Sequence, residues 1–360
     1  MMLSRVADSM YWMSRYIERA ENIARFIDVN ALLTMELGDA VHQQWGPLVA
    51  VTGDEAVFRE SYGDATRANV MRFLTFDENY PNSIMSCLSG ARENARIVRE
   101  YISTAMWEQL NKFYLMVHDQ AKLGTPLDAE SDFYAEVRAG SQLFVGVTDG
   151  TFSHGEGWHF ARLGRMLERA DKTSRILDVR YFLLLPQITD VGTPLDIVQW
   201  SALLRSASAL NMYRAAHGRL QPNKIAEFLL LDPDFPRAVR HCADAAESSL
   251  RSITGTPQRT FRNSAEQKLG RLRAELDYTS IDDVLNEGFH EFIDRMQIRL
   301  NEISAALQDS LLTPRTSQFP PPPSAAVSSG NSFSQAQSQI QTQAQTIPKG
   351  TSRQLAGRLD

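Results

Sequence analysis

Cysteine is scarce in this sequence, and no apolar segment is long. Cys87 and Cys242 are the two cysteines in 360 residues, too few for a disulfide framework or a four-cysteine zinc site. The apolar run that starts at Tyr181 is "YFLLL", far short of the roughly 20 residues that cross a bilayer. Arg5 and Asp8 precede any apolar run, so the N-terminus does not resemble a secretory signal. We therefore expect a cytoplasmic protein with no membrane association.

A strong charge of one sign is also absent. The formal net charge is −6, and the segment from residue 313 onward carries more basic than acidic residues, so the preceding body is more acidic still. Proteins that bind DNA or RNA usually present a basic surface. We therefore expect no nucleic-acid partner, and any anion site must be a local cluster of arginines.

Long alternating runs of β-branched residues are missing as well, which argues against a β-sheet. Apolar residues instead recur at helical spacing through most of the chain. This pattern predicts an all-α fold with helices over residues 3–37, 83–120, 157–185, 195–217, 236–254, 262–275 and 281–311. The sequence has no Walker loop, no dinucleotide-binding fingerprint and no G-x-S-x-G element. We therefore expect no cofactor.

What the sequence does contain is one short charged segment in two versions. "YIERAENIARFIDV" begins at Tyr16, and "MLERADKTSRILDV" begins at Met166, 150 positions later. The turn segments "DENYP" and "DPDFP" form a second matching pair, at an offset of 155. These matches predict two tandem homologous helical-bundle repeats, residues 1–152 and 153–312, packed about a pseudo-twofold axis.

The composition changes at the C-terminal end of the second repeat. Residues 313–360 are rich in Pro, Ser and Gln and have almost no large apolar side chains. Such a segment cannot bury enough apolar surface to offset its loss of conformational entropy. We predict a disordered tail.

The repeated segment places its charges on one ridge of a helix, opposite a broad apolar face. The ridge comprises Arg15, Glu18, Arg19, Asn22 and Arg25 in the first repeat and Arg165, Glu168, Arg169, Lys172 and Arg175 in the second. Four of these five positions have the same residue in both repeats, whereas the apolar positions 16, 17, 23, 26 and 27 match at none. A solvated face should vary freely, so some contact constrains these charges.

Two explanations for the constraint stay open beside an ordinary solvated surface. In the first, the two helices pair with each other, with Glu18 facing Arg169 and Glu168 facing Arg19. In the second, the arginines converge on an anionic ligand such as a carboxylate or phosphate, which the planar guanidinium binds through parallel hydrogen bonds. An open cleft lined by arginines would favour the ligand.

A third charged helix adds further candidates, Arg92, Glu93, Asn94 and Arg96. The corresponding stretch of the second repeat replaces Glu93 and Asn94 by serines and keeps the arginine that matches Arg96. This asymmetry predicts that the first repeat carries any specific site. The simpler interpretation is that Glu93 and Arg96 form an i, i+3 pair on an exposed helix face.

Two other chemistries are weaker possibilities. His154, Glu156 and His159 have the spacing H-x-E-x-x-H, and not the H-E-x-x-H spacing that places two histidines on one helical face. Ser153 and Glu156 fit a capping box that opens the second repeat, so we expect no metal. Neither cysteine has a histidine at a matched position, so both are expected to be buried apolar residues.

Three motifs give the chain a family resemblance. "MLSRVADSMYWMSRYIERAEN" from Met2, "SIMSCLSGARENARIVRE" from Ser83 and "GEGWHFARLGRMLERAD" from Gly155 resemble the bacterial alpha-E domain family over about residues 2 to 312. The Glu-Arg motif of that family corresponds to Glu18-Arg19 and to the same pair in the second repeat. The resemblance implies partnership with co-encoded circularly permuted ATP-grasp and transglutaminase-like proteins in an amide-forming, peptide-ligation system.

Two functions are therefore compatible with the sequence. The first is a non-catalytic helical partner or scaffold of the ATP-grasp system, which binds an anionic or peptide substrate through its Arg/Glu clusters. The second is an enzyme acting on an acidic substrate, with Glu18 or Glu168 as general base and arginines as an anion clamp. A pocket in which these residues converge would favour the second.

Overall fold

The computed structural model describes residues 2–37, 45–123, 130–184 and 194–313. Every regular element in these ranges is a helix, and they contain no strand, which confirms the all-α prediction. Within the same ranges, no helix combines the length and the apolarity needed to cross a membrane. The predicted disordered tail lies outside the described residues, apart from Thr313.

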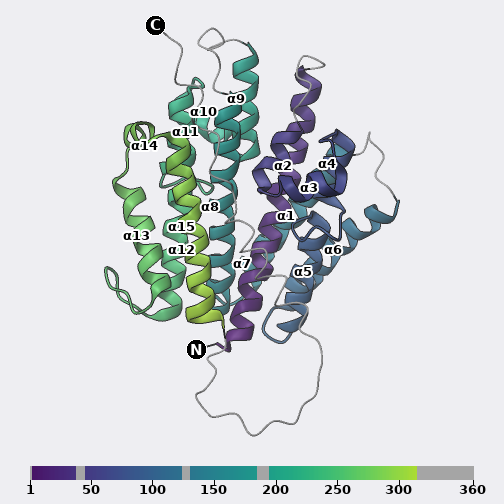
Figure 1. Ribbon diagram of the computed structural model, residues 1–360. Helices are drawn as coiled ribbons and strands as arrows, with labels where there is room; N and C mark the ends of the chain where they lie inside the picture. The colour runs from purple at the N-terminus through teal and green to yellow at the C-terminus, as the bar shows by residue number, and fades with distance from the viewer. Residues whose placement is uncertain (1, 38–44, 124–129, 185–193, 314–360) are drawn as a thin grey trace. The chain divides into compact units, whose positions relative to one another are not determined.

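The two longest helices, α1 and α8, carry the repeated charged segment (Figure 1). The helices are α1 (Ser4–Leu37), α2 (Gly46–Thr52), α3 (Glu55–Tyr62), α4 (Arg67–Thr75), α5 (Ile84–Ile97), α6 (Thr104–Leu123), α7 (Glu130–Thr151), α8 (Glu156–Leu184), α9 (Pro194–Ser206), α10 (Leu210–His217), α11 (Pro222–Leu231), α12 (Val239–Thr254), α13 (Ser264–Tyr278), α14 (Ile281–Glu287) and α15 (Phe289–Leu307), followed by a π-helical turn (Gln308–Leu312).

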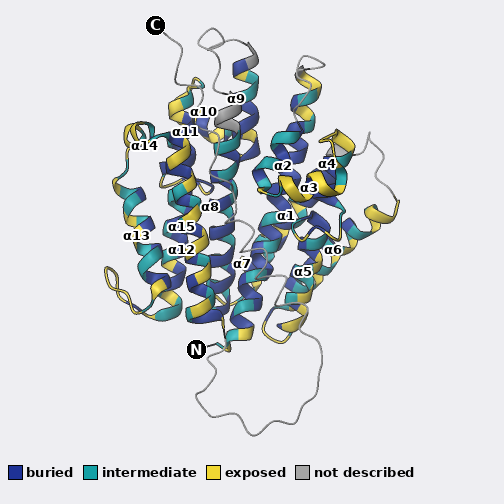
Figure 2. Cartoon of the chain, in the orientation of Figure 1, coloured by how far each residue is buried: buried dark blue, intermediate teal, exposed yellow. Residues whose placement is uncertain are grey.

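Helices α1 and α8 pack against each other and are enclosed by the rest of the described fold (Figure 1). Helix α1 also packs against α5, α7 and α9, whereas α8 also packs against α12, α15 and α9. Figure 2 shows the middle of α1 as buried, although its ridge is charged. A charge removed from water needs a partner inside the protein. Because α1 and α8 pack against each other, the partners of their charged side chains must come from the facing helix or from the helices around the pair.

The two central helices approach each other closely at Gly164. A Cβ atom on Gly164 would lie 2.4 Å from the carbonyl oxygen of Tyr11, so a larger residue could not occupy this position without moving the helices apart. Glycine thus permits the backbone of α8 to touch that of α1. The ridge residues of both helices come within hydrogen-bonding reach of each other as a result.

Three helices predicted from apolar spacing are interrupted in the structure. The predicted helix 83–120 divides into α5 and α6, 195–217 divides into α9 and α10, and 281–311 divides into α14 and α15. Ser208 has a φ of 53° at the second break, and Gly288 has a φ of 106° at the third. A right-handed helix cannot continue through such a residue, and apolar periodicity does not reveal the break.

Helices α2, α3, α4, α7 and α11 were not predicted. The pair Gly46-Pro47 reads as a helix breaker, but the proline lies in the first turn of α2, where its missing N–H costs nothing. Helix α7 contains Gly140, Gly146 and Gly150, which lower its intrinsic helix propensity. Packing of α7 against α1 and α6 outweighs that preference.

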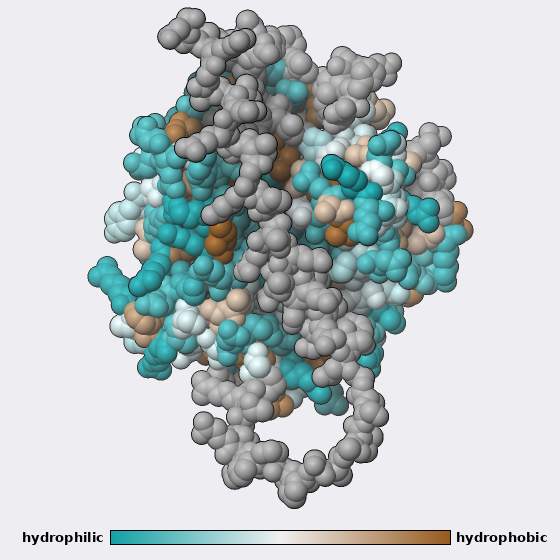
Figure 3. All heavy atoms as spheres, viewed as in Figure 1, coloured by the Kyte–Doolittle hydropathy of each residue, from teal (hydrophilic) through white to brown (hydrophobic). Residues whose placement is uncertain are grey.

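The described part of the face in Figure 3 is mostly hydrophilic, with single hydrophobic residues scattered over it. Isolated apolar side chains are normal on a folded surface. This face therefore presents no large apolar patch among the described residues.

Candidate functional site

The first half of the candidate site is centred on Glu168, whose side chain is fully buried. Arg15 Nε donates to Glu168 Oε2 at 2.8 Å, and Arg19 donates to both carboxylate oxygens, at 2.7 and 2.9 Å. Burial alone would raise the pKa of Glu168, but the charges of Arg19 and Arg15 outweigh it and hold that pKa well below its usual value. The carboxylate is therefore ionised and fully engaged.

Arg15 has further partners of its own. Its Nη1 donates to the hydroxyl of Tyr11 at 3.1 Å and to Ser304 Oγ at 3.3 Å. The guanidinium of Arg15 is thus held by one carboxylate and two hydroxyls.

The second half of the site is centred on Glu18, also buried. Arg169 donates to both oxygens of Glu18 at 2.8 Å, and Arg237 Nη1 donates to Oε1 at 3.0 Å. The side-chain amide of Asn22 also donates to Oε1, at 3.0 Å. Burial would raise the pKa of Glu18, but Arg169 and Arg237 together bring it well below its usual value.

A second acid extends each half. Arg237 Nη2 donates to Glu21 at 2.6 Å, and Arg25 also pairs with Glu21. On the other side, Asp171 accepts from Arg175 Nε at 2.9 Å and pairs with a lysine of the same helix. Burial opposes ionisation of Asp171, but the charge of Arg175 prevails and lowers its pKa to about 2.

The predicted cross pairing of the two helices is therefore present. Glu18 faces Arg169, and Glu168 faces Arg19, each through a two-pronged hydrogen-bonded ion pair. The pairs join residues about 150 positions apart in sequence. They explain the shared ridge positions through contacts inside the protein.

Sequence reasoning missed Arg237, which contacts both acids of the Glu18 half. Arg237 directly follows "DPDFP", and Asn82 directly follows the matching "DENYP". Asn82 Oδ1 accepts from Arg19 Nη1 at 2.6 Å, so both residues reach the paired helices from the same kind of turn. The signal was the residue after each turn, which is a neutral asparagine at position 82 and a basic arginine at position 237.

The third charged helix does not join this network. Glu93 and Arg96 pair at 2.9 Å with both side chains at least half exposed, as the simpler interpretation expected. Arg92 Nε donates to Asn111 at 2.8 Å, and Asn94 donates to a carbonyl oxygen of its own helix. These four residues therefore form local contacts of α5 and α6.

Arg165 is the one ridge residue of α8 without a partner among the described residues. Its Nε is buried and makes no hydrogen bond, and no carboxylate lies within ion-pair distance of its guanidinium. Burial, and next the charge of Arg169, lower the pKa of Arg165 to about 10, so the group stays protonated at neutral pH. The attraction of Glu18 opposes this lowering only in part, and Arg165 forms no hydrogen-bonded ion pair among the described residues.

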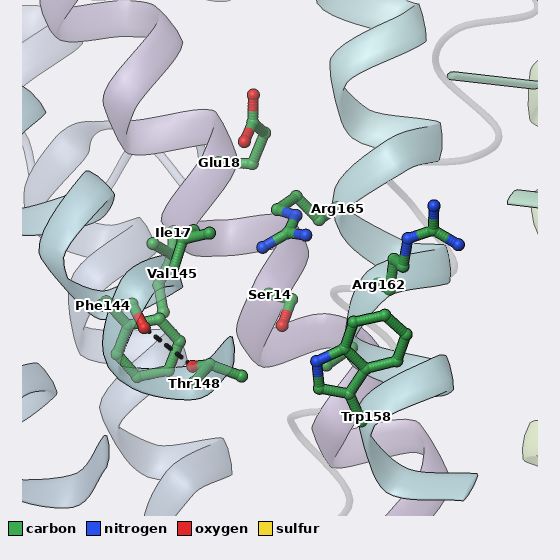
Figure 4. Close-up of a pocket in the computed structure, with 10 residues that line it drawn as sticks. Ser14, Ile17, Glu18, Phe144, Val145, Thr148, Trp158, Arg162 and Arg165 are labelled. Carbon is green, nitrogen blue, oxygen red and sulfur yellow. Dashed lines mark hydrogen bonds between the residues drawn. The ribbon is translucent and has the colours of Figure 1, made fainter. Parts of the chain in front are cut away.

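Arg165 lines a pocket between α1, α7 and the start of α8 (Figure 4). The pocket has a volume of about 360 Å³ including its open mouth, but its enclosed interior has room for only one or two water molecules. The lining consists of Ser14, Ile17, Glu18, Phe144, Val145, Thr148, Trp158, Ala161, Arg162 and Arg165. Of Arg15, Arg25, Arg96 and Arg165, only Arg165 lines it, so the arginines do not share one cleft.

The other reactive groups are placed unfavourably for chemistry. Cys87 and Cys242 are fully buried, and burial raises the pKa of each thiol to about 12, so both match the expected apolar role. Helix α8 begins at Glu156, whose carboxylate accepts from the backbone N–H of Met2 at 2.7 Å, an arrangement the predicted capping box did not include. Within the described ranges, no three His, Cys, Asp or Glu side chains gather as metal ligands would.

The fold and these contacts define a class of protein: an all-helical bundle whose two central helices are joined by buried Glu-Arg pairs. Residues 2–312 match the alpha-E family, described as a predicted alpha-helical domain with a conserved ER motif, and the chain belongs to that family.

Similar chains occur in mycobacteria. Uncharacterized proteins of Mycobacterium bovis and Mycobacterium tuberculosis are 26% identical over 275 residues, and another from M. tuberculosis is 25% identical over the same length. Each alignment covers 70% of this chain and 30% of the relative, so the chain spans less than a third of the length of the relatives it matches. No solved structure matches the chain.

Proposed function

We propose that this protein is a non-catalytic helical partner or scaffold of an ATP-grasp system that forms amide bonds in peptide ligation. The observation that carries the proposal is the length of the mycobacterial relatives, in which the matching region is 30% of a longer protein. In these relatives the matching region is covalently joined to other protein sequence. A region that works next to other sequence in one chain is suited to work beside a separate protein in another. The partner class, a circularly permuted ATP-grasp protein with a transglutaminase-like protein, comes from the family resemblance.

The non-catalytic part of the proposal is supported by the state of the acids. A general base needs a pKa near the working pH and a free lone pair. Glu18 and Glu168 each accept from two arginines, and their pKa values are held well below the usual range. Carboxylates in this state are weak bases, which disfavours the alternative of a Glu-Arg enzyme.

We also propose that the helical body arose by duplication, with repeats at 1–152 and 153–312 related by a pseudo-twofold axis. Reciprocal pairing supports this, because each Glu-Arg motif reaches the motif of the other helix. The cysteines support it as well. Cys87 Sγ contacts the carbonyl oxygen of Pro81, and Cys242 Sγ contacts that of Pro236; each residue of the second contact lies 155 positions after its counterpart in the first.

The partnership is tested by reconstitution in the cytoplasmic setting that the proposal assumes. The full chain is co-expressed with the co-encoded ATP-grasp protein, and the pair is examined by pull-down and size-exclusion chromatography. We expect co-elution, and we expect ATP-dependent amide product to fall when this chain is left out. Absence of association, together with unchanged product formation, would refute the proposal. Product formation by this chain alone would favour the enzyme.

A further inference from the structure

Arg165 and Arg15 occupy the same place in the two versions of the charged segment, yet their surroundings differ. Arg15 is completed by a carboxylate oxygen of Glu168 at 2.8 Å and by two hydroxyls. Arg165 has no such group among the described residues. The protein itself thus shows which chemical group satisfies an arginine at this position of the motif.

The carboxylate that Arg165 would otherwise use is already occupied. Both oxygens of Glu18 accept from Arg169, and Oε1 also accepts from Arg237. Figure 4 shows the Glu18 carboxylate directed away from Thr148 and Trp158, while the guanidinium of Arg165 points into the space beside Ser14. Arg165 therefore faces a pocket in place of an internal acid.

The pocket offers hydrogen-bond donors and few free acceptors. Ser14 and Trp158 have no hydrogen-bond partner among the described residues, and Figure 4 shows the indole nitrogen on the side of Trp158 that faces Ser14 and Thr148. Thr148 already donates to the carbonyl oxygen of Phe144 at 2.8 Å. Arg165, Ser14 and Trp158 thus provide donors around one small space, as anion sites do.

The nearby charges limit which anion fits. Arg162 turns its guanidinium toward α12, where it donates to Ala245 and Ser249, so it adds positive potential without reaching the interior. Glu18 in the wall repels a second negative charge. Apolar side chains, among them Ile17 and Val145, form the rest of the lining. A planar anion with one charge and an apolar substituent suits this combination.

We propose that this pocket binds a carboxylate group, held by the guanidinium of Arg165 and by the hydroxyl of Ser14 and the indole N–H of Trp158. The interior accepts only the carboxylate and the carbon next to it, because it has room for one or two waters. The remainder of the ligand extends through the mouth past Trp158 and Arg162, which are only partly buried. The inference stands on the pocket and needs no ATP-grasp partner.

The test measures binding of N-acetylalanine to the full chain by titration calorimetry at low ionic strength. N-acetylalaninamide, which lacks the negative charge, and inorganic phosphate are measured in parallel. We expect a dissociation constant in the region of about 1 mM for the acid, because few atoms make contact, and at least tenfold weaker binding of the other two. Equal binding of the amide, stronger binding of phosphate, or no binding of the acid would overturn the proposal.

The variant Arg165→Met removes the guanidinium group and keeps an unbranched apolar side chain. We expect it to lose N-acetylalanine binding at least tenfold while its melting temperature without ligand stays equal to or above that of the wild type, because the cost of burying the charge outweighs its attraction to Glu18. Arg15→Met is the matched control and should lower the melting temperature. A comparable loss of stability in both variants, or unchanged binding in Arg165→Met, would contradict the assignment.

Two sources of a carboxylate are separated by a third arm. A tripeptide with a free C-terminus is compared with N-acetylalanine and with the same tripeptide amidated at its end. Tighter binding of the free tripeptide identifies a peptide terminus as the ligand, and equal binding identifies a small carboxylic acid. The amidated tripeptide should bind at least tenfold more weakly in either case, and failure of that difference would count against a carboxylate.

Discussion

The two halves of the charged site carry the same motif but are completed by different neighbours. Around Glu168, the second cation is Arg15 from the paired helix, and Asn82 supports the bidentate arginine. Around Glu18, the second cation is Arg237, which stands where the other half has Asn82. The residue after each turn thus differs between the halves: Arg237 donates to Glu18, whereas Asn82 accepts from Arg19.

The difference follows from the limited capacity of a carboxylate. A carboxylate offers about four acceptor positions, and the bidentate Arg169, Arg237 and Asn22 together make four hydrogen bonds to Glu18. Arg237 supplies one of these bonds to Glu18, so Arg165 is not needed there and is directed at the pocket. The two segments therefore keep the same charges, although Arg15 and Arg165 have different surroundings.

The largest effect is expected from removing a central acid. Glu168→Ala leaves Arg15 and Arg19 buried without their carboxylate, and breaking a buried pair in this way costs about 3–5 kcal/mol. Urea unfolding monitored by circular dichroism measures the loss. A change below about 1 kcal/mol would mean that water or other groups compensate the arginines, and that the Glu168 half is no tighter than a surface pair.

A comparable loss should accompany acidification. The folded-state pKa values of Glu18, Glu168 and Asp171 all lie below their ordinary values, so each acid contributes stability that is complete above pH 4.5 and disappears as the pH falls through the folded value. For Asp171, with a pKa of about 2, the contribution is roughly 2 kcal/mol. Unfolding free energies at pH 7, 5, 4 and 3 should be level at first and decline below pH 4.5. A decline already between pH 7 and 5 would contradict these shifts.

A smaller but more specific effect is expected from Arg237→Asn. This substitution gives the Glu18 half an asparagine, the residue that the Glu168 half has at position 82. Glu18 then lacks its second cation, and Arg165 can turn to it, so the stability loss should be limited to about 1–3 kcal/mol. The carboxylate affinity of the pocket should fall at least tenfold although Arg165 is unchanged. Calorimetry with N-acetylalanine tests this, and retained affinity would show that Arg237 does not set the orientation of Arg165.

The smallest effect is expected on the third charged helix. Glu93→Gln breaks a pair whose side chains are 66% and 50% exposed, and such pairs contribute about 0–1 kcal/mol. Unfolding in urea should place the variant within about 0.5 kcal/mol of the wild type. A loss approaching that of Glu168→Ala would restore Glu93 as a candidate for the specific site.

Part of the buried Glu-Arg network was predictable from particular residues of the sequence. The match of Glu18-Arg19 with Glu168-Arg169, against a changing apolar face, predicted pairing between two helices. The same ridge also permitted a ligand site lined by Arg15, Arg25, Arg96 and Arg165, and spacing along one helix could not exclude it. The residue that separates these outcomes, Arg237, lies far from the motif in sequence.

The amino-acid sequence by itself determined the helical class and the charged ridges, because periodicity and motif matching act locally along the chain. It offered the Glu18–Arg169 and Glu168–Arg19 pairs as one of the possible contacts. The tertiary structure alone decided that Arg15 meets a carboxylate while Arg165 meets a pocket. This difference depends on the close approach of the helices at Gly164 and on the hydrogen bond from Arg237 to Glu18. Both are contacts between separate helices, which neither charged segment specifies by its own sequence.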